Sequence, residues 1–347
     1  MPSRTATDEL AESAVASTSH EAPAGQAIAR PAGAVVRPRS SRLANWDRLR
    51  LLSFCDIAAF HMTGRYLLLG MGLPTFLVLR FALASRLPVP EPTRKFIHVR
   101  VEKLLVPWAA WSLLFGALIA AQSLRKGIPL GEVFTPYMLL YGTSDHLWFL
   151  PFAALVGILV HFIDVATQRV PTRIFVAAAG VTGMVLVWVT HLLHPLVDQQ
   201  PFRQWIFGAP SVPIGLMLGR ILARPWKDGR RVWAFLLAAC TVMIALILLQ
   251  RPAGGRIATE PFRYTLTVGL VALAALLPGG MDRWTSKLTP LLLGGYLLLD
   301  VLYEQTLGRL VHARGWDPAP VVLVAVMAPA TLLLVAALRK TGLKAIL

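Results

Sequence analysis

The sequence predicts an all-α polytopic membrane protein with about ten transmembrane helices and both termini in the cytoplasm. Of its 347 residues, 56% are hydrophobic and only 15% are charged, and a soluble domain of this size does not need so much apolar surface. Apolar runs long enough to cross about 30 Å of hydrocarbon recur along the chain after residue 50. Short loops that carry Arg, Pro and Gly separate these runs.

Ten apolar runs are expected to span the bilayer. They cover residues 49–69, 71–86, 101–121, 146–166, 171–192, 203–223, 232–250, 264–280, 288–308 and 319–338. The second run is short, so we expect its helix to be tilted, kinked or partly re-entrant. Residues 128–143 are expected to form a surface helix on the outer side or to dip into the membrane, which leaves the parity of the spans unchanged.

The distribution of Lys and Arg predicts the orientation of the chain. The net charge is +16, and the segments on the N-terminal side of the predicted bilayer hold more than twice as many Lys and Arg as the opposite loops. The positive-inside rule therefore places both termini in the cytoplasm and explains the charge without nucleic acid. The basic loops also suit contact with anionic lipids or with an anionic cofactor. We expect a bacterial plasma membrane protein, because the high Ala, Leu, Arg and Pro content is compatible with a GC-rich bacterial source.

Residues 1–44 are predicted to be a disordered cytoplasmic tail, because they are rich in Ala, Ser, Thr, Pro and Arg and lack hydrophobic periodicity. No apolar stretch typical of a cleaved signal peptide precedes Arg50. Cys55 and Cys240 form no metal or redox spacing, so we expect free buried thiols and no metal site. The transmembrane domain is expected to occupy residues 45–347.

Arg50 and His61 lie eleven residues apart in the first predicted span. At about 100° per residue both side chains share one helix face, and a rise of about 16 Å separates them. This spacing places a cation at the inner edge of the hydrocarbon and a titratable imidazole near its middle. Ionisable groups at such positions are costly and are read as functional by default.

Three motifs occur in order in the first half of the chain. Residues 45–50 read NWDRLR and precede His61, residues 96–108 read FIHVRVEKLLVPW, and residues 146–151 read HLWFLP. Together they resemble the membrane acyltransferase 3 family, in which Asp-x-x-Arg is followed by a histidine after ten intervening residues. The basic start of the third helix, ending in Leu-Val-Pro, and the His-x-Trp-Phe-Leu start of the fourth are also similar to this family. The resemblance covers nearly the whole predicted transmembrane domain.

The resemblance implies an integral membrane O-acyltransferase that moves an acyl group, usually acetyl, from acyl-coenzyme A to a hydroxyl of a glycan or a glycosylated metabolite. His61 would then take the hydroxyl proton as general base or carry the acyl group briefly. A structural hydrogen bond is the alternative role for this histidine. Arg50 would contact a phosphate or the substrate, or would anchor the helix at the inner interface.

Other residues of the three motifs are candidates for binding. Arg100 and Lys103, at the inner end of the third span, either bind the phosphates of the coenzyme or anchor the helix. His146 and Trp148 are candidate acceptor contacts, because Asp145 could polarise the His146 imidazole and the Trp148 ring could stack on a sugar. The alternatives are a helix N-terminal cap for Asp145 and His146 and an interfacial anchor for Trp148.

The chain departs from the family pattern at two places. Residues 76–81 read FLVLRF where the family usually carries Ser-Gly, and the Tyr-containing segment of the ninth span ends in Asp300 instead of histidine. Asp300 and Glu304 share one helix face, and they either line the acceptor site or pair with polar groups of other helices. The departures imply a different substrate.

Asp56 and Arg80 are the unusual charges within the predicted spans. Each lies six residues, about 9 Å, from an inner-edge arginine, so both are expected at a similar depth. An unpaired charge there costs at least about 2.5 to 3.5 kcal/mol. We therefore predict that Asp56 and Arg80 form an ion pair between the first two helices.

A small-molecule transporter or exporter is the rival hypothesis. In that protein, Asp56, Arg80, Asp300 and Glu304 would form a substrate path or a proton relay. Transporters commonly contain repeated halves, and no repeat is visible in this sequence.

Overall fold

The structure is a computed structural model that describes residues 41–85, 92–223, 229–250, 259–278, 283–303, 308, 314–315 and 318–346. Every regular element within these residues is a helix, which confirms the all-α prediction. The predicted tail lies outside the described residues up to position 40, and its last four positions already belong to the first helix. Cys55 and Cys240 are free as expected, and Cys240 is buried, whereas Cys55 is only half-buried.

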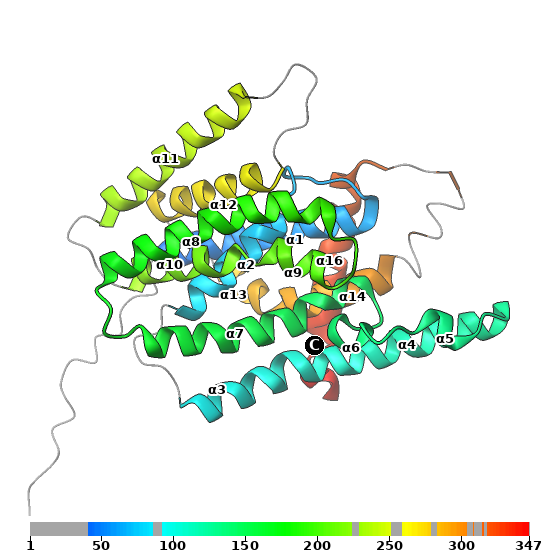
Figure 1. Ribbon diagram of the computed structural model, residues 1–347. Helices are drawn as coiled ribbons and strands as arrows, with labels where there is room; N and C mark the ends of the chain where they lie inside the picture. Colours follow the sequence, from blue (N-terminus) through cyan, green and yellow to red (C-terminus); the bar gives the residue numbers. More distant parts are fainter. Residues whose placement is uncertain are drawn as a thin grey trace, which may run out of the picture. The chain divides into compact units, whose positions relative to one another are not determined.

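Figure 1 shows the helices of the described residues, coloured in chain order. In chain order they are α1 (Ser41–Thr63), α2 (Gly72–Ser85), α3 (Thr93–Arg100), the π-helix η1 (Val101–Leu105), α4 (Val106–Lys126), α5 (Leu130–Val133), α6 (Met138–Tyr141), η2 (Asp145–Trp148), α7 (Phe149–Ala166), α8 (Thr172–Leu193), η3 (His194–Leu196), α9 (Phe202–Gly208), α10 (Ser211–Ala223), α11 (Gly229–Leu249), α12 (Thr259–Leu276), α13 (Arg283–Leu288), η4 (Thr289–Leu291), α14 (Leu292–Leu302), α16 (Pro320–Leu338) and η6 (Gly342–Ile346).

Six helical segments of the described chain are long and apolar enough to cross a membrane, as expected for a polytopic membrane protein. They are Thr93–Lys126, Asp145–Ala166, Thr172–Leu196, Phe202–Ala223, Gly229–Leu249 and Pro320–Leu338. Each coincides with a predicted span. The helices α1, α2, α12 and α13 to α14 occupy the positions of the other four, and α2 is apolar but has only 14 residues.

The core of the described fold is built around α2 and α10, which pack closely on each other. Glycines on α10 make this approach possible. A Cβ atom at Gly215 would lie 2.6 Å from the Phe81 Cβ, and one at Gly219 would lie 2.5 Å from the Ala82 carbonyl oxygen. Small residues four positions apart are a common way to bring helix backbones together in membranes. In the span that contains α10, 72% of the apolar window is buried, against 11% in α11. The helix α10 is therefore central and α11 peripheral.

A buried ion pair connects four helical segments at the end of α10. The Arg220 Nη2 lies 3.1 Å from the Asp164 Oδ1 of α7 and donates to the Thr167 hydroxyl at 3.0 Å. Ser85, the last residue of α2, donates to the same Asp164 oxygen at 3.1 Å. The Arg220 guanidinium also lies 4.6 Å from the ring centre of Phe175 on α8. Within the described residues, Asp164 and Arg220 thus form an ion pair that sequence analysis did not predict.

The predicted ion pair between Asp56 and Arg80 is wrong. The Asp56 carboxylate, 1% exposed, accepts backbone N–H groups of Leu68 at 2.6 Å and Gly72 at 2.8 Å. Gly72 begins α2, so Arg80 lies eight residues, about 12 Å, further along that helix. Asp56 and Arg80 lie at different depths because α2 starts beside Asp56. The carboxylate is satisfied by backbone donors, and Arg80 lies near Arg50 and Arg100 instead.

Candidate active site

A cavity of about 480 Å³ surrounds the C-terminal end of α1, and we call it the His61 cavity. Its wall comes from α1, from the connection between α1 and α2, from η2, from the segment between α8 and α9, and from α12 and α14. Exposed side chains at its rim connect it to the surface, among them Tyr66, Asp145, Asp198 and Arg203. Segments far apart in the sequence therefore meet at this cavity.

His61 is half-buried and lies in the last turn of α1, not in the middle of a helix reaching residue 69. The helix ends early because Gly64 has φ +67° and donates its N–H to the Phe60 carbonyl at 2.8 Å. A glycine in the left-handed region is a common helix terminator. The chain then folds back toward α2, and this return places the imidazole at the cavity wall.

Besides its neighbour Phe60, two rings from other helical segments lie edge-on to the His61 imidazole. The Tyr296 ring centre is 5.9 Å away, the His146 ring centre is 6.3 Å away, and these two rings are 5.7 Å from each other. Tyr296 belongs to α14, so three helical segments converge on this triangle. The structure thus brings two predicted site residues, His61 and His146, together and adds Tyr296.

His146 is buried, 2% exposed, behind the cavity wall. Its Nδ1 lies 3.0 Å from the Ser144 hydroxyl, and its backbone carbonyl accepts the Tyr296 hydroxyl at 2.7 Å. The interpretation of His146 with Asp145 as a helix cap is wrong, because Ser144 occupies the N-cap position and makes no side-chain cap bond. Asp145 is exposed at the cavity rim. The Nδ1 atom of the His146 imidazole therefore meets the Ser144 hydroxyl.

Trp148 is also buried, 5% exposed, and lines the His61 cavity. Its ring contacts Phe149 and Phe152 of α7, with centres 6.3 and 5.6 Å away. A membrane-interface anchor would lie on the outside of the bundle, so the anchor interpretation is wrong. Trp148 instead gives the cavity an aromatic surface.

One wall of the His61 cavity is a stack of aromatic and cationic groups. The Tyr66 ring stacks on Phe60 at 4.6 Å, and the Arg263 guanidinium of α12 lies 4.7 Å from the Tyr66 ring centre. Gly70 has φ +75°, and a Cβ there would lie 2.8 Å from the Arg263 Nε. Only glycine leaves this space, so the connection between α1 and α2 closes over Arg263. Asp56 holds the same connection through its two hydrogen bonds.

A carboxylate shared by two histidines lies beside this wall. Glu260, at the start of α12 and 5% exposed, has its Oε2 2.9 Å from the His191 Nδ1 and its Oε1 3.4 Å from the His194 Nδ1. The Thr259 hydroxyl donates to the Glu260 Oε2 at 2.7 Å. His194 lines the His61 cavity. Sequence reasoning missed Tyr66, Tyr296 and this group, because positions so far apart meet only after folding.

The predicted cofactor residues lie away from the cavity. Arg80 is close enough to Arg50 and Arg100 for their like charges to act on it. The Arg50 guanidinium lies 3.5 Å from the Asp47 carboxylate, and that of Arg100 lies 4.7 Å from the Phe96 ring centre. We call Arg50, Arg80 and Arg100 the arginine cluster. Its member on α1, Arg50, is about 16 Å along the helix from His61.

Lys103 is not one of the residues of the arginine cluster, and its side chain is exposed. It lies in the π-helical turn η1, which directly follows Arg100. In an α-helix, residues three apart share one face, but the wider π turn separates them around the axis. The Asp300 side chain and all of Glu304 lie outside the described residues.

Comparisons of the chain with protein-family models, with curated proteins and with solved structures found no match. The proposal that follows therefore rests on the motifs and on the geometry of the His61 cavity.

Proposed function

We propose that the protein is an integral membrane O-acyltransferase that moves an acyl group, in the simplest case acetyl, from acyl-coenzyme A to a hydroxyl of a sugar-containing acceptor. The observation that carries this proposal is the position of His61. Its imidazole lines a cavity large enough for a sugar. The same helix, α1, carries Arg50 of the arginine cluster nearer its other end. The resemblance of residues 45–61, 96–108 and 146–151 to membrane acyltransferase 3 proteins supports the same assignment.

The reaction in this proposal needs one proton acceptor and no redox partner. His61 takes the proton of the acceptor hydroxyl while the hydroxyl oxygen attacks the thioester carbonyl carbon. A carbon–oxygen bond forms, the carbon–sulfur bond breaks, and the thiolate leaves with the electron pair. The proton passes from His61 to that sulfur, so the products are an ester and free coenzyme A. In the alternative route, the imidazole first accepts the acyl group and then passes it to the hydroxyl.

The arginine cluster suits the donor substrate. Coenzyme A carries several phosphate charges, and Arg presents planar donors that match phosphate oxygens. The like charges of Arg50 and Arg100 act on Arg80, while Asp47 pairs with Arg50. A phosphate group bound among these arginines would reduce their mutual repulsion. The acyl-bearing arm would extend from this cluster between the helices toward His61.

The His61 cavity suits a sugar acceptor. The Trp148 side chain in its lining offers an aromatic surface for a sugar ring. Asp145, Asp198 and Gln204 line the same cavity and supply hydrogen-bond partners for hydroxyl groups. An acceptor bound there would meet the imidazole at the wall.

We further propose ten transmembrane spans, both termini in the cytoplasm and a location in a bacterial plasma membrane. The ten helical segments in the predicted positions and the excess of basic residues on the N-terminal side support this topology. The arginine cluster then lies on the cytoplasmic side, where acyl-coenzyme A is present, and the His61 cavity lies on the outer side.

The test is coenzyme A release from acetyl-coenzyme A by the purified protein in lipid nanodiscs with a panel of sugars. We expect His61→Ala to lower acceptor-dependent release by about 10²- to 10⁴-fold, the usual contribution of a positioned general base. The control is His98→Ala, because His98 is exposed on α3. Equal release by the two variants would show that His61 is not the base.

In the part of the chain that the structure describes, Asp56 and Arg80 do not form the charge path that the transporter hypothesis requires. Asp56 is held by backbone donors and does not pair with Arg80. Movement of a labelled metabolite across the membrane without coenzyme A release would favour a transporter over the enzyme.

A further inference from the structure

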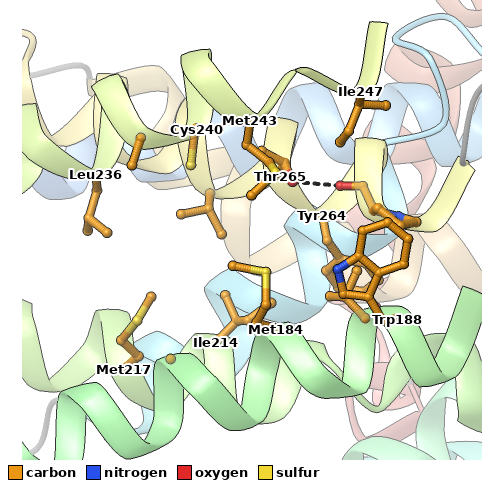
Figure 2. A pocket seen from close by; sticks show the side chains of 15 residues that line it. Met184, Trp188, Ile214, Met217, Leu236, Cys240, Met243, Ile247, Tyr264 and Thr265 are labelled. Carbon is orange, nitrogen blue, oxygen red and sulfur yellow. Dashed lines mark hydrogen bonds between the residues drawn. The ribbon is translucent and has the colours of Figure 1, made fainter. Parts of the chain in front are cut away.

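A second cavity, lined by apolar side chains, lies next to the candidate active site. This apolar pocket has a volume of about 270 Å³, and its lining comes from α8, α10, α11 and α12. Figure 2 shows Met184 and Trp188 of α8 on one side of it and Leu236, Cys240 and Met243 of α11 on the other. The proposed acyl transfer does not use this space.

The apolar pocket lies in a gap between two membrane-spanning helices. The helix α11 packs on α12, and α8 packs on α10 and α12, but α8 and α11 do not pack closely on each other. Ile214 of α10 and Tyr264 of α12 close the gap at its back. Within a bilayer such a gap is reached from the lipid, and an apolar chain fills it without burying an unpaired polar group.

The apolar pocket and the His61 cavity share a wall. Tyr264 lines the pocket, Phe207 lines the cavity, and their ring centres are 6.1 Å apart. The Tyr264 hydroxyl donates to the Phe207 carbonyl and lies 3.1 Å from the Ser211 hydroxyl. Arg263, the residue before Tyr264, lines the cavity. Consecutive residues of α12 therefore face the two spaces.

A line of contacting side chains extends from the apolar pocket toward the His61 cavity at the end of α8. The Trp188 ring lines the pocket and lies edge-on to His191, with centres 6.0 Å apart. His191 contacts Glu260, and Glu260 contacts His194, which lines the His61 cavity. The residues Trp188, His191 and His194 follow one another at helical spacing toward the end of α8. The surface thus changes from apolar to polar in the direction of the active site.

We propose that the apolar pocket binds the alkyl or isoprenoid chain of a lipid-linked acceptor, whose hydroxyl-bearing head group reaches His61 past His194. This inference rests on the proposed function and names its acceptor class. An amphiphile fits both spaces at once: the chain occupies the gap between α8 and α11, and the head group lies in the His61 cavity.

The first experiment measures acyl transfer in nanodiscs to methyl, octyl and dodecyl glucoside. We expect kcat/KM to rise at least tenfold from the methyl to the dodecyl acceptor. Ala239 lines the pocket on α11, and its exposed neighbour Ala238 does not. Ala239→Phe should abolish the chain-length gain, and the matched control Ala238→Phe should keep it. Equal kcat/KM for methyl and dodecyl acceptors, or equal behaviour of the two variants, overturns the chain site even in an active enzyme.

The second experiment needs no turnover. A dodecyl glucoside with a diazirine at the chain end is photolysed with the protein, and labelled peptides are identified by mass spectrometry. We expect labels on α8 and α11 that disappear in Ala239→Phe and remain in Ala238→Phe. If acyl transfer fails with every acceptor but this labelling holds, the proposed function is wrong and the chain site stands. Equal labelling of both variants overturns the chain site. Gly180→Leu, on the α8 side of the pocket, replaces Ala239→Phe if that variant does not fold.

Discussion

Asp56 shows how a buried charge is stabilised without a countercharge. Its two oxygens accept N–H groups from Leu68 and Gly72, and these bonds hold the connection between α1 and α2 against the helix. A carboxylate offers only acceptors, so it suits two converging donors. A Cβ at Gly72 would lie 2.7 Å from the Asp56 Cβ, so glycine is needed for this close approach.

We expect Asp56→Asn to lower the free energy of unfolding by about 1–3 kcal/mol, the usual cost of leaving a buried donor unsatisfied. The amide keeps one acceptor oxygen and turns an NH2 group toward a backbone N–H. The measurement is thermal unfolding in detergent, with Glu102→Gln as control because Glu102 is exposed. Matching unfolding temperatures for the two variants would contradict this role.

At the scale of the elements, Asp164 and Arg220 hold the ends of α2, α7, α8 and α10 together. Removing one partner of a buried pair leaves the other charge uncompensated, whereas an apolar replacement of both is often tolerated. The predicted ion pair between α1 and α2 does not form, because α2 begins beside Asp56 and Arg80 lies about 12 Å further along that helix. The position of a helix end therefore decides which charges meet.

We expect Asp164→Ala to destabilise the protein by about 3–5 kcal/mol, because Arg220 is buried and loses its carboxylate. The double variant Asp164→Leu with Arg220→Met should recover most of that loss. Thermal unfolding of the single and double variants in the same detergent measures the difference. A double variant no more stable than Asp164→Ala would refute the ion-pair explanation.

At the scale of the whole molecule, the arginine cluster is assembled from three helices that are far apart in the sequence. Arg80 is an arginine within the apolar helix α2, and the fold places it close enough to Arg50 and Arg100 for their charges to act on it. This arrangement gives a reason for an arginine in an apolar helix: it adds a cation to the proposed phosphate site.

We expect Arg80→Gln and Arg100→Gln each to weaken coenzyme A binding about tenfold, which corresponds to about 1.4 kcal/mol. The loss of a charge-assisted contact to phosphate is the reason. Calorimetric titration of nanodisc-embedded protein with coenzyme A measures the affinity. Arg94→Gln on the exposed face of α3 is the matched control, and equal affinity of all three variants would exclude the cluster as the phosphate site.

The sequence by itself determined the all-helical class and the positions of the apolar segments, and it singled out His61 and His146, which the fold brings together. These features follow from composition, from hydrophobic run length and from local motifs, which are properties of neighbouring residues. The tertiary structure alone decided that α1 ends at Thr63, that Asp56 binds backbone N–H groups, that Arg220 pairs with Asp164 and that Trp148 faces a cavity. Each of these depends on which helix ends come together, and side chains more than a hundred positions apart, such as His61 and Tyr296, become neighbours only through packing that no local pattern encodes.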